Sequence, residues 1–444
     1  MDAYLLRDRL KARPERSQDS MNKMDSIVDD QDDSTDLKLA TLVSLFPNVE
    51  QVTLLDLLIS ANGSVEAVKL SLSSPAELSS PRKRSAAGIG YQTSLSSFKK
   101  AKASSPDLPS TKRRALTRKG QTLHLYSPED IAVHTPCSII HNFLPAEEAD
   151  KLLKELLEEA PTFERQTFKL FDNVVQSPHS ACFYVNSLEE REKQKTEYLY
   201  NGSFLTDVRE ITPQMRIVSS KVQTAVNDEI AERIKHHYPD GKKLKYQSPK
   251  SWIPNAAFVN CYKGGAESVG YHCDQLTYLG PRAIIGSLSL GVAREFRVRK
   301  IVARDDEEDT ASKTKGSRAD AEGQVAIHLP HNSLLVMHAE MQEEWKHSIH
   351  PASVIDPHPI AGNRRINITY RHYRESFHPR YTPRCKCGVA TVLRCVQRKK
   401  ENRGRYMWMC HAGNTPGKEG CAFFQWAEFD DDGEPPWMRQ AIEK

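Results

Sequence analysis

The second half of this chain contains a series of short β-type segments, and this series limits the folds that the chain can adopt. The segments are 255–262, 283–290, 295–302, 324–329, 333–337 and 364–373. Two helical patterns precede them, an amphipathic stretch that begins at Pro145 and a second stretch over 212–236. Helices followed by many short strands predict an α+β domain around a β-sandwich or jelly-roll, which we place at residues 121–380.

Polar and apolar residues alternate along the last of these segments. The polar set comprises Arg365, Asn367, Thr369 and Arg371. This period of two predicts a strand with one polar and one apolar face, and an ordinary half-exposed strand is the alternative. Arginines in a buried region need an anionic partner, and guanidinium groups pair bidentately with carboxylates. A dicarboxylate such as 2-oxoglutarate would satisfy them while also chelating iron.

A second constellation lies upstream, at His272-Cys273-Asp274. Residues two apart in an extended segment project to the same side, so this imidazole and this carboxylate converge on one point. A second imidazole would complete the two-histidine, one-carboxylate face that binds iron(II) and leaves positions open for oxygen chemistry. Two histidines downstream, His347 and His350, are candidates for the third ligand.

Four motifs in this order resemble the AlkB family of Fe(II)/2-oxoglutarate dioxygenases. They are Asn260-Cys-Tyr262, His272-Cys-Asp274, His347-Ser and Arg365-Ile-Asn367-Ile-Thr369-Tyr-Arg371. The resemblance covers most of 121–380 and implies a double-stranded β-helix, or jelly-roll, with iron and 2-oxoglutarate as cofactors. It implies iron ligands at His272, Asp274 and His347, with Arg365 completing the catalytic set. It also implies a 2-oxoglutarate site formed by Asn260, Tyr262, Arg365, Asn367 and Arg371.

The match is nearest to the DNA-repair branch of that family, so it implies oxidative demethylation of N-alkylated bases in nucleic acid, with release of succinate, carbon dioxide and formaldehyde. Two departures leave the preferred base open. Leu276 stands where the repair enzymes carry an acidic residue, and Pro178-His179 replaces a Pro-Arg pair. The alternatives are a dioxygenase of the same fold that acts on protein side chains, and a non-enzymatic adaptor for ubiquitin and nucleic acid.

Residues 383–429 contain four cysteines whose spacing suits a tetrahedral structural zinc site. They are Cys385, Cys387, Cys410 and Cys421, with Cys395 as a spare. A unit this short needs such a metal to fold independently, so we expect a small zinc-bound β module followed by a tail over 430–444. Gly404-Arg405-Tyr406-Met-Trp408-Met-Cys410 and its flanking motifs resemble the GRF zinc-finger family. That resemblance implies binding of single-stranded nucleic acid, with Arg405 and Trp408 as contacts.

The N-terminal part of the chain divides into a polar segment and a helical one. Residues 1–35 are predicted to be disordered, whereas 36–75 have apolar residues at helical spacing and predict three short helices. The helical segment resembles the CUE family of ubiquitin-binding modules. The implied ubiquitin contacts are Phe46, Pro47, Leu57 and Leu58. A mini-bundle without a binding role is the alternative.

Residues 76–120 are rich in Ser, Pro, Lys and Arg and predict a disordered basic linker. Its basic clusters, such as Pro81-Arg82-Lys83-Arg84, indicate nuclear import or contact with phosphates, so we expect a nuclear protein. Within it, Gln92, Leu95 and Phe98 resemble the box that binds the sliding clamp, although Lys99 replaces the second aromatic residue.

Composition excludes other classes of protein. The sequence has no apolar run of the length that a transmembrane helix needs, so we expect no membrane partner. The first residues lack the apolar core of a signal peptide. The nine cysteines are odd in number and cluster late, which indicates intracellular metal binding rather than a disulfide framework.

Overall fold

The computed structural model forms two compact units, Met1–Pro75 and Ala76–Lys444. It describes residues 121–170, 173–200, 203–302, 323–415 and 418–438, together with a few positions between Leu42 and Leu72. The predictions for 1–35, for the linker over 76–120 and for its clamp-like box therefore lie outside the described residues.

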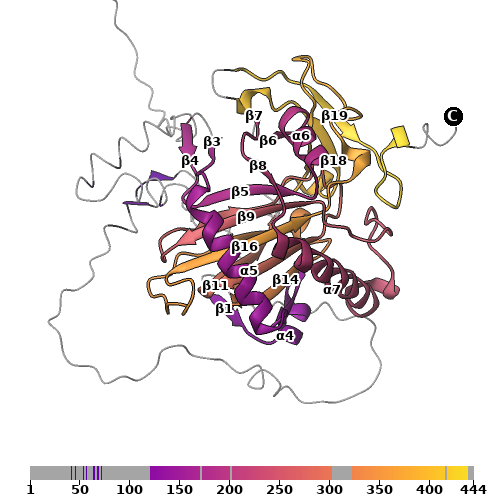
Figure 1. The fold of residues 1–444 in the computed structure, drawn as a ribbon. Helices are drawn as coiled ribbons and strands as arrows, with labels where there is room; N and C mark the ends of the chain where they lie inside the picture. The colour runs from indigo at the N-terminus through magenta and orange to yellow at the C-terminus, as the bar shows by residue number, and fades with distance from the viewer. Residues whose placement is uncertain are drawn as a thin grey trace, which may run out of the picture. The chain divides into compact units, whose positions relative to one another are not determined.

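The second unit is built on a seven-stranded sheet (Figure 1). In spatial order its strands are β2 (Cys137–His141), β14 (Ser333–Met337), β11 (Ile285–Gly291), β16 (Arg364–Arg371), β9 (Ala256–Lys263), β5 (Ser180–Val185) and β8 (Val208–Glu210). All pairs are antiparallel except β5 with β8. Four of the six segments predicted as strands are present in this sheet, as β9, β11, β14 and β16, to within two residues at each end.

A five-stranded sheet lies across an apolar core from the first. Its strands are β1 (Thr122–Leu125), β13 (Gln324–Leu329), β12 (Arg294–Lys300), β15 (Trp345–Ile349) and β10 (Val269–His272). The core between the sheets takes Ile285 and Met337 from the large sheet and Phe296, Val298 and Ile327 from the small one. Two facing sheets are the arrangement expected of a β-sandwich or jelly-roll.

Helices cover the other face of the large sheet (Figure 1). The α-helices in the described part of this unit are α4 (Pro128–His134), α5 (Ala146–Glu159), α6 (Leu188–Thr196), α7 (Pro213–His237) and α8 (Met341–Glu344). Helix α5 buries the side chains Leu152, Leu153, Leu156 and Leu157, which follow its predicted amphipathic pattern. These leucines share a second core with Val222 of α7 and with Ile366 and Ile368 of β16. The apolar face of β16 therefore meets the helices, and its polar face points between the sheets.

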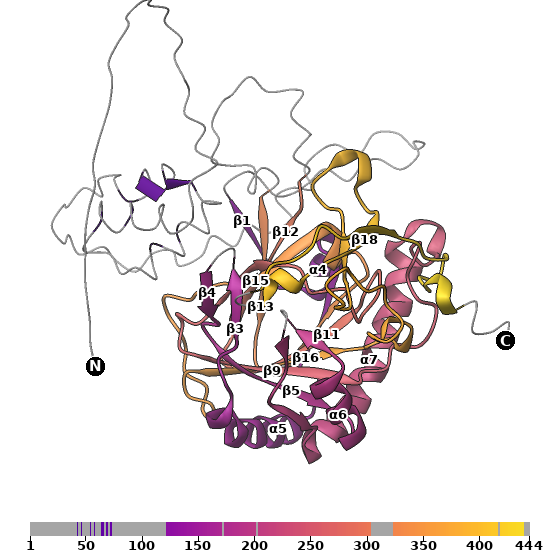
Figure 2. The ribbon, with the colours of Figure 1, turned by 90° about the horizontal axis from the view of Figure 1, so that it is seen from above.

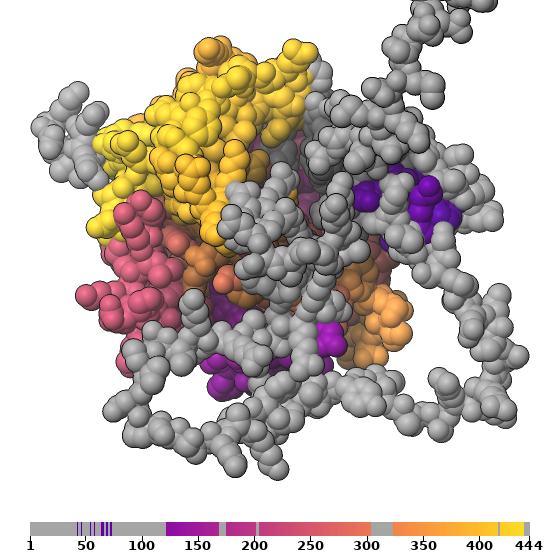
Figure 3. Space-filling model, turned by 180° about the vertical axis from the view of Figure 1, so that it is seen from behind, coloured from indigo at the N-terminus to yellow at the C-terminus, as the bar shows by residue number. Residues whose placement is uncertain are grey.

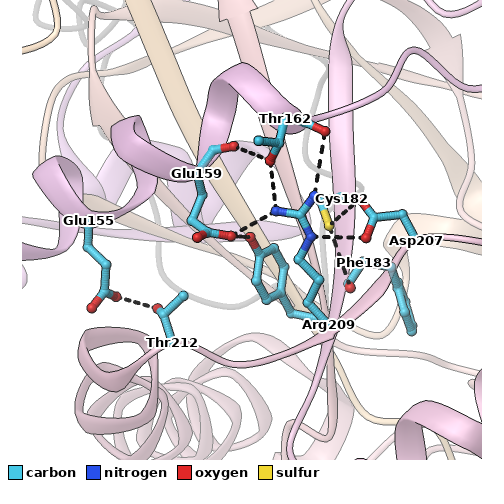
Figure 4. Close-up of polar contacts among 9 residues, drawn as sticks. Glu155, Glu159, Thr162, Cys182, Phe183, Asp207, Arg209 and Thr212 are labelled. Atoms are coloured by element: carbon cyan, nitrogen blue, oxygen red, sulfur yellow. Dashed lines mark hydrogen bonds and ion pairs between the residues drawn. The ribbon is translucent and has the colours of Figure 1, made fainter.

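A polar network fixes α5 to the edge strand β8 (Figure 4). Arg209 donates to Glu159 at 2.8 Å and to Asp207 at 2.6 Å, and it also reaches the hydroxyl of Thr162. Burial of the Asp207 carboxyl opposes ionisation, but the bond from Arg209 outweighs it and lowers the Asp207 pKa. Two short hairpins complete the large domain: β3 (Thr167–Leu170) with β4 (Asn173–Gln176), and β6 (Leu199–Tyr200) with β7 (Ser203–Phe204).

The C-terminal segment forms a three-stranded sheet of β17 (Val392–Cys395), β18 (Tyr406–Met409) and β19 (Phe424–Ala427). We expected a separate small unit here, and in the structure its sheet shares the core of the large domain. Tyr406 and Trp408 are buried in that core, and Trp408 packs near Phe377 with ring centroids 6.3 Å apart. The yellow C-terminal segment accordingly lies directly on the large domain in Figure 3.

The predicted tail also packs on the large domain. The Asp431 carbonyl accepts a hydrogen bond from Tyr246 N at 2.9 Å, and Glu434 pairs with Arg374 at 3.0 Å. The Trp437 indole donates to the Ser376 carbonyl at 2.9 Å. These contacts hold the described residues up to Met438 against the large domain.

In the N-terminal unit, Leu42, Leu54, Val65 and Val68 form a small buried cluster, and all four are helical. Phe46 and Leu57, two predicted ubiquitin contacts, are partly buried against this cluster, whereas Pro47 and Leu58 lie outside the described residues. Ubiquitin binding stays a prediction. None of the helices in the described part of the chain is both long and apolar enough to cross a membrane.

Candidate active site and metal centres

The strands β10 and β15 of the small sheet bring His272, Asp274 and His347 together. The strand β10 ends at His272, and its pairing with β15 sets His272 opposite His347. Asp274 Oδ1 lies 3.6 Å from His272 Nε2 and 3.5 Å from His347 Nε2. The three ligand atoms lie within 4.8 Å of one another, a spacing that suits one metal ion bound by two histidines and a carboxylate. His350, the rival third ligand, is not part of this group.

Neighbouring groups set the orientation and the protonation state of these side chains so that they can bind a cation. His272 Nδ1 lies 2.9 Å from the Gly270 carbonyl, which leaves Nε2 directed at the site. Burial and then the neighbouring His347 lower the pKa of His272 to about 4, so the imidazole is neutral at pH 7. Burial alone would raise the pKa of Asp274, but the adjacent Arg371 and His347 outweigh it, and the pKa lies well below its usual range. Asp274 is therefore an ionised carboxylate.

A buried arginine without a full set of partners lies on β16. The side chain of Arg365 is fully buried; its Nη2 donates to the Ser289 hydroxyl at 2.9 Å. Its Nε and Nη1 atoms have no hydrogen-bond partner within the described part of the chain. Burial lowers the pKa of Arg365 to about 10, so the group still carries a charge at pH 7. A buried charged donor pair needs an anion, and a carboxylate of 2-oxoglutarate fits that need.

The other residues implied for 2-oxoglutarate have different roles in the structure. The Tyr262 ring lies 5.2 Å from the Arg365 guanidinium. Asn367 donates to the Ser287 hydroxyl at 2.9 Å and to the Leu288 carbonyl at 3.1 Å, so its amide holds β11 rather than facing a ligand with free donors. Arg371 binds Asp274 instead, and only its Nη1 atom remains without a partner among the described residues.

His179 contacts the cofactor-site residues, which sequence reasoning did not foresee. Its ring stacks on Tyr262 with centroids 4.6 Å apart, and its Nε2 lies 3.1 Å from Asn260 Oδ1. Burial lowers the pKa of His179 to about 4, so the neutral ring donates to Asn260 and accepts from Ser177. His179 therefore orients Asn260 and Tyr262. Leu276, the other departure from the family pattern, is 4% exposed and packs in the core between the sheets.

The four predicted zinc ligands also converge. Cys385, Cys387, Cys410 and Cys421 have sulfur atoms within 4.8 Å of one another. Backbone N–H groups of Ala412 and Cys421 point at Cys410 Sγ, each at 3.4 Å, as expected around a thiolate. Cys395 is outside this group. Four cysteines in this arrangement fit a structural zinc ion.

The aromatic residues of the zinc module separate into core and surface. The prediction that Trp408 contacts nucleic acid was wrong, because its side chain is 1% exposed and lies between Phe377 and Trp437. Arg405 is exposed, and its guanidinium lies 3.8 Å from the centroid of the Trp426 ring. Phe424 is 51% exposed and packs edge-on against Trp426. These three residues form a cationic, aromatic surface, which we call the Arg405 surface.

Comparison with known proteins agrees with this geometry. The family model of the 2OG-Fe(II) oxygenase superfamily matches residues 136–371, more than half of the chain, and the GRF zinc finger model matches residues 383–430. The chain is 34% identical to "DNA oxidative demethylase ALKBH2" of Arabidopsis thaliana over 26% of this chain and 37% of that protein. It is 24% identical to human "Alpha-ketoglutarate-dependent dioxygenase alkB homolog 3" over 52% of this chain and 63% of that protein.

Human "DNA oxidative demethylase ALKBH2" is 30% identical over 28% of this chain and 48% of that protein. The matched segments thus span between 37% and 63% of these three relatives. The family model covers every candidate ligand of the iron site and ends at Arg371. The chain belongs to the 2OG-Fe(II) oxygenase superfamily, as an enzyme similar to AlkB homologues with a C-terminal GRF zinc finger.

Proposed function

We propose that this enzyme oxidatively demethylates N-alkylated bases in nucleic acid, with DNA favoured over RNA. The observations that carry the proposal are the convergence of His272, Asp274 and His347 on one point, and a buried Arg365 whose Nε and Nη1 atoms have no partner among the described residues. Two of the relatives named above are described as DNA oxidative demethylases, which favours DNA. The Arg405 surface adds the charge and the exposed rings that single-stranded nucleic acid requires.

Each side chain has a defined task in this reaction. When bound, iron(II) with oxygen and 2-oxoglutarate supplies oxidation of the methyl group, with succinate, carbon dioxide and formaldehyde as products. His272, Asp274 and His347 would hold the iron, and Arg365 would bind a carboxylate of 2-oxoglutarate. His179 orients Asn260 and Tyr262, and the Tyr262 ring lies next to the Arg365 guanidinium. Arg371 orients Asp274 and keeps it ionised.

The target base must leave the duplex or be single-stranded to reach a site between two sheets. Several rings adjoin the Arg371 side of the site: Phe258 lies 5.0 Å from the Arg371 guanidinium, and Tyr200 and Tyr373 share a hydrogen bond of 3.1 Å. Flat aromatic rings suit the stacking of an extruded base. We assign base selection to this region, in which the rings of Phe258 and Tyr200 are only partly buried.

Mass spectrometry of methylated oligonucleotides tests the proposal. A panel of DNA and RNA strands, each with one methylated base in single- or double-stranded form, is incubated with iron(II), ascorbate and 2-oxoglutarate. Loss of the methyl group from at least one strand, absent in Asp274→Ala, is expected. Succinate release with peptides but not with nucleic acid would favour the protein side-chain alternative. No succinate under any condition would favour the adaptor.

The remaining partners belong to the same proposal and need separate tests. Binding to ubiquitin through the unit Met1–Pro75 would connect demethylation with ubiquitin-marked sites, and pull-down with wild-type and Leu57→Ala protein measures it. Nuclear localisation and clamp binding rest on the basic linker and on Gln92, Leu95 and Phe98. Microscopy after replacement of Arg82, Lys83 and Arg84 tests the first, and titration of the clamp with a peptide over 90–102 tests the second.

A further inference from the structure

One side chain of the zinc module reaches the iron-binding segment. Gln397 lies just after β17, and its Nε2 atom donates to Cys273 Sγ at 3.3 Å and to the Gln342 carbonyl at 2.9 Å. Cys273 lies between two candidate iron ligands, His272 and Asp274. The module thus touches the segment that supplies two of the three ligands, and in Figure 2 the C-terminal segment again lies against the large domain.

Gln342 extends this contact to the third ligand. Its side chain is 1% exposed, and its Oε1 atom accepts a hydrogen bond from Asp274 N at 2.7 Å. Gln342 belongs to α8, which ends where β15 begins, and β15 carries His347. Gln397 therefore holds both chain segments that must keep their spacing for the three ligand atoms to converge.

Two further contacts fix α8 and the small sheet to the zinc module. The Tyr406 hydroxyl donates to Glu343 Oε1 at 3.0 Å, and that oxygen also accepts from Arg282 N at 2.7 Å. Arg403 donates to the Ile301 carbonyl at 2.7 Å. Tyr406 and Trp408 are buried in the core of the large domain. The module cannot move away from α8 without exposing these rings, so its fold and the geometry of α8 are coupled.

We propose that the zinc finger is the outer support of the iron site, and that zinc binding strengthens iron binding through the positioning residue Gln397. Groups that orient the ligands of a metal contribute to its affinity, and their loss commonly costs about 10- to 100-fold. In this proposal, bound zinc fixes the positions of β17 and β18 and therefore of Gln397. The hydrogen bonds of Gln397 then fix Gln342 and Cys273, and Gln342 in turn holds the backbone of Asp274 in place. The inference rests on the iron site assigned under the proposed function.

Anaerobic titration of the full chain with iron(II) in the presence of 2-oxoglutarate tests the proposal without any turnover. The visible charge-transfer band of the ternary complex reports both affinity and ligand geometry. Gln397→Met keeps the side-chain length and removes the donor. We expect a dissociation constant for iron(II) raised roughly tenfold and a shifted band, at unchanged zinc content. Gln425→Met, on the exposed face of β19, is the matched control and should behave as wild type.

Wild-type affinity and an unshifted band in Gln397→Met would overturn the inference but leave the proposed function intact. Failure of the wild type to bind iron(II) would instead overturn the site assignment itself.

A second measurement needs no variant and decides the matter if Gln397→Met loses zinc. Coupling between two sites is reciprocal, so occupation of the iron site must stabilise the zinc module. Hydrogen exchange of the wild-type protein is compared with and without Mn(II), a redox-stable substitute for iron, together with 2-oxoglutarate. Slower exchange is expected in peptides covering 392–409, with no change in the α7 segment 219–232. Equal exchange in 392–409 would overturn the coupling.

Discussion

Arg371 donates two hydrogen bonds to a single oxygen of Asp274, from Nε at 2.9 Å and from Nη2 at 2.5 Å to Oδ2. The other oxygen, Oδ1, faces the two histidines. The strand that carries the polar face thus fixes which carboxylate oxygen is available to a metal. Charge-assisted bonds of this kind are the stronger class of hydrogen bond, so the orientation is well defined.

Asp274→Ala is expected to abolish iron binding and turnover, because it removes the only anionic ligand of the triad. Zinc content should stay near wild type, since the four cysteines are elsewhere in the chain. Formaldehyde release and metal content by mass spectrometry measure the two effects. Asp228→Ala, an exposed position on α7, is the control. Formaldehyde release at the wild-type rate from Asp274→Ala would sink the assignment.

Arg365→Met should weaken 2-oxoglutarate far more than iron. The change keeps most of the volume and removes charge-assisted bonds worth about 1.5–3 kcal/mol, which corresponds to roughly 10- to 100-fold in affinity. Arg364→Met, its neighbour on the opposite face of β16, is the matched control. The dependence of succinate formation on 2-oxoglutarate gives the comparison. An equal effect of the two changes would move the anchor to another residue, with Arg371 next in line.

The sequence pattern predicted the strands that carry the cofactor residues, over 255–262 and 364–373, because β-type composition, and in the second segment alternation, is a local signal. It did not predict β10 and β15 as strands. The strand β10 has four residues and an irregular register against β15, so its ligand His272 was found from the His-x-Asp motif instead. The motif identified the ligands where the periodicity was too short to define the element.

The contacts of the zinc module could not be predicted because they join residues far apart in sequence. Nothing near Gln397 indicates that its amide meets Cys273, and an aromatic residue such as Trp408 has the same local pattern in a core and on a binding surface. The module looked independent since four thiolates can fold a short unit alone. Only tertiary packing shows that its rings complete the core of the large domain.

Stability should depend on pH through Glu343, at the contact between α8 and the zinc module. Burial raises its pKa to about 7, only partly offset by Arg282 and by Tyr406, with Glu344 adding to the rise. A pKa raised in the folded state means stability that is full below the unfolded value and is lost as pH rises through about 7. The melting temperature should therefore fall between about pH 4.5 and pH 8 through this group.

Glu343→Gln should remove that fall and stabilise the protein at pH 8, by up to about 3 kcal/mol. Thermal unfolding at several pH values measures the difference, with Glu428→Gln, an exposed carboxylate of the zinc module, as the control. A wild-type-like pH profile in Glu343→Gln would show that the carboxyl is already neutralised by Arg282 at every pH.

The aromatic residues of the zinc module should separate by phenotype. Phe424→Ala should weaken binding of a single-stranded oligonucleotide, since stacking of one base contributes about 1–3 kcal/mol, and leave the melting temperature unchanged. Trp408→Ala should destabilise the protein by about 3–5 kcal/mol, because it empties a core position. Fluorescence anisotropy and thermal unfolding distinguish them. A destabilised Phe424→Ala protein, or unchanged affinity, would contradict the Arg405 surface.

The last prediction concerns loss of zinc. In an independent module, Cys410→Ser would unfold residues 383–429 and leave the catalytic domain intact. Because Leu393, Tyr406 and Trp408 belong to the core of the large domain, we instead expect loss of zinc to lower the stability of both. Calorimetry of the wild type should show the large domain and the zinc module unfolding in one transition. That transition should shift to lower temperature in Cys410→Ser. Cys395→Ser, a cysteine outside the zinc group, is the control.

Turnover further distinguishes a finger that only binds substrate from a finger that also supports the iron site. If the finger only gathers substrate, Cys410→Ser should lose efficiency on long single strands but retain it on short oligonucleotides, and the loss should shrink as salt rises. With the finger supporting the iron site, efficiency should fall on both lengths at both salt concentrations, and excess iron(II) should restore part of it on the short substrate. Full activity of Cys410→Ser on short substrates at limiting iron(II) would show that the catalytic domain keeps its geometry without the finger.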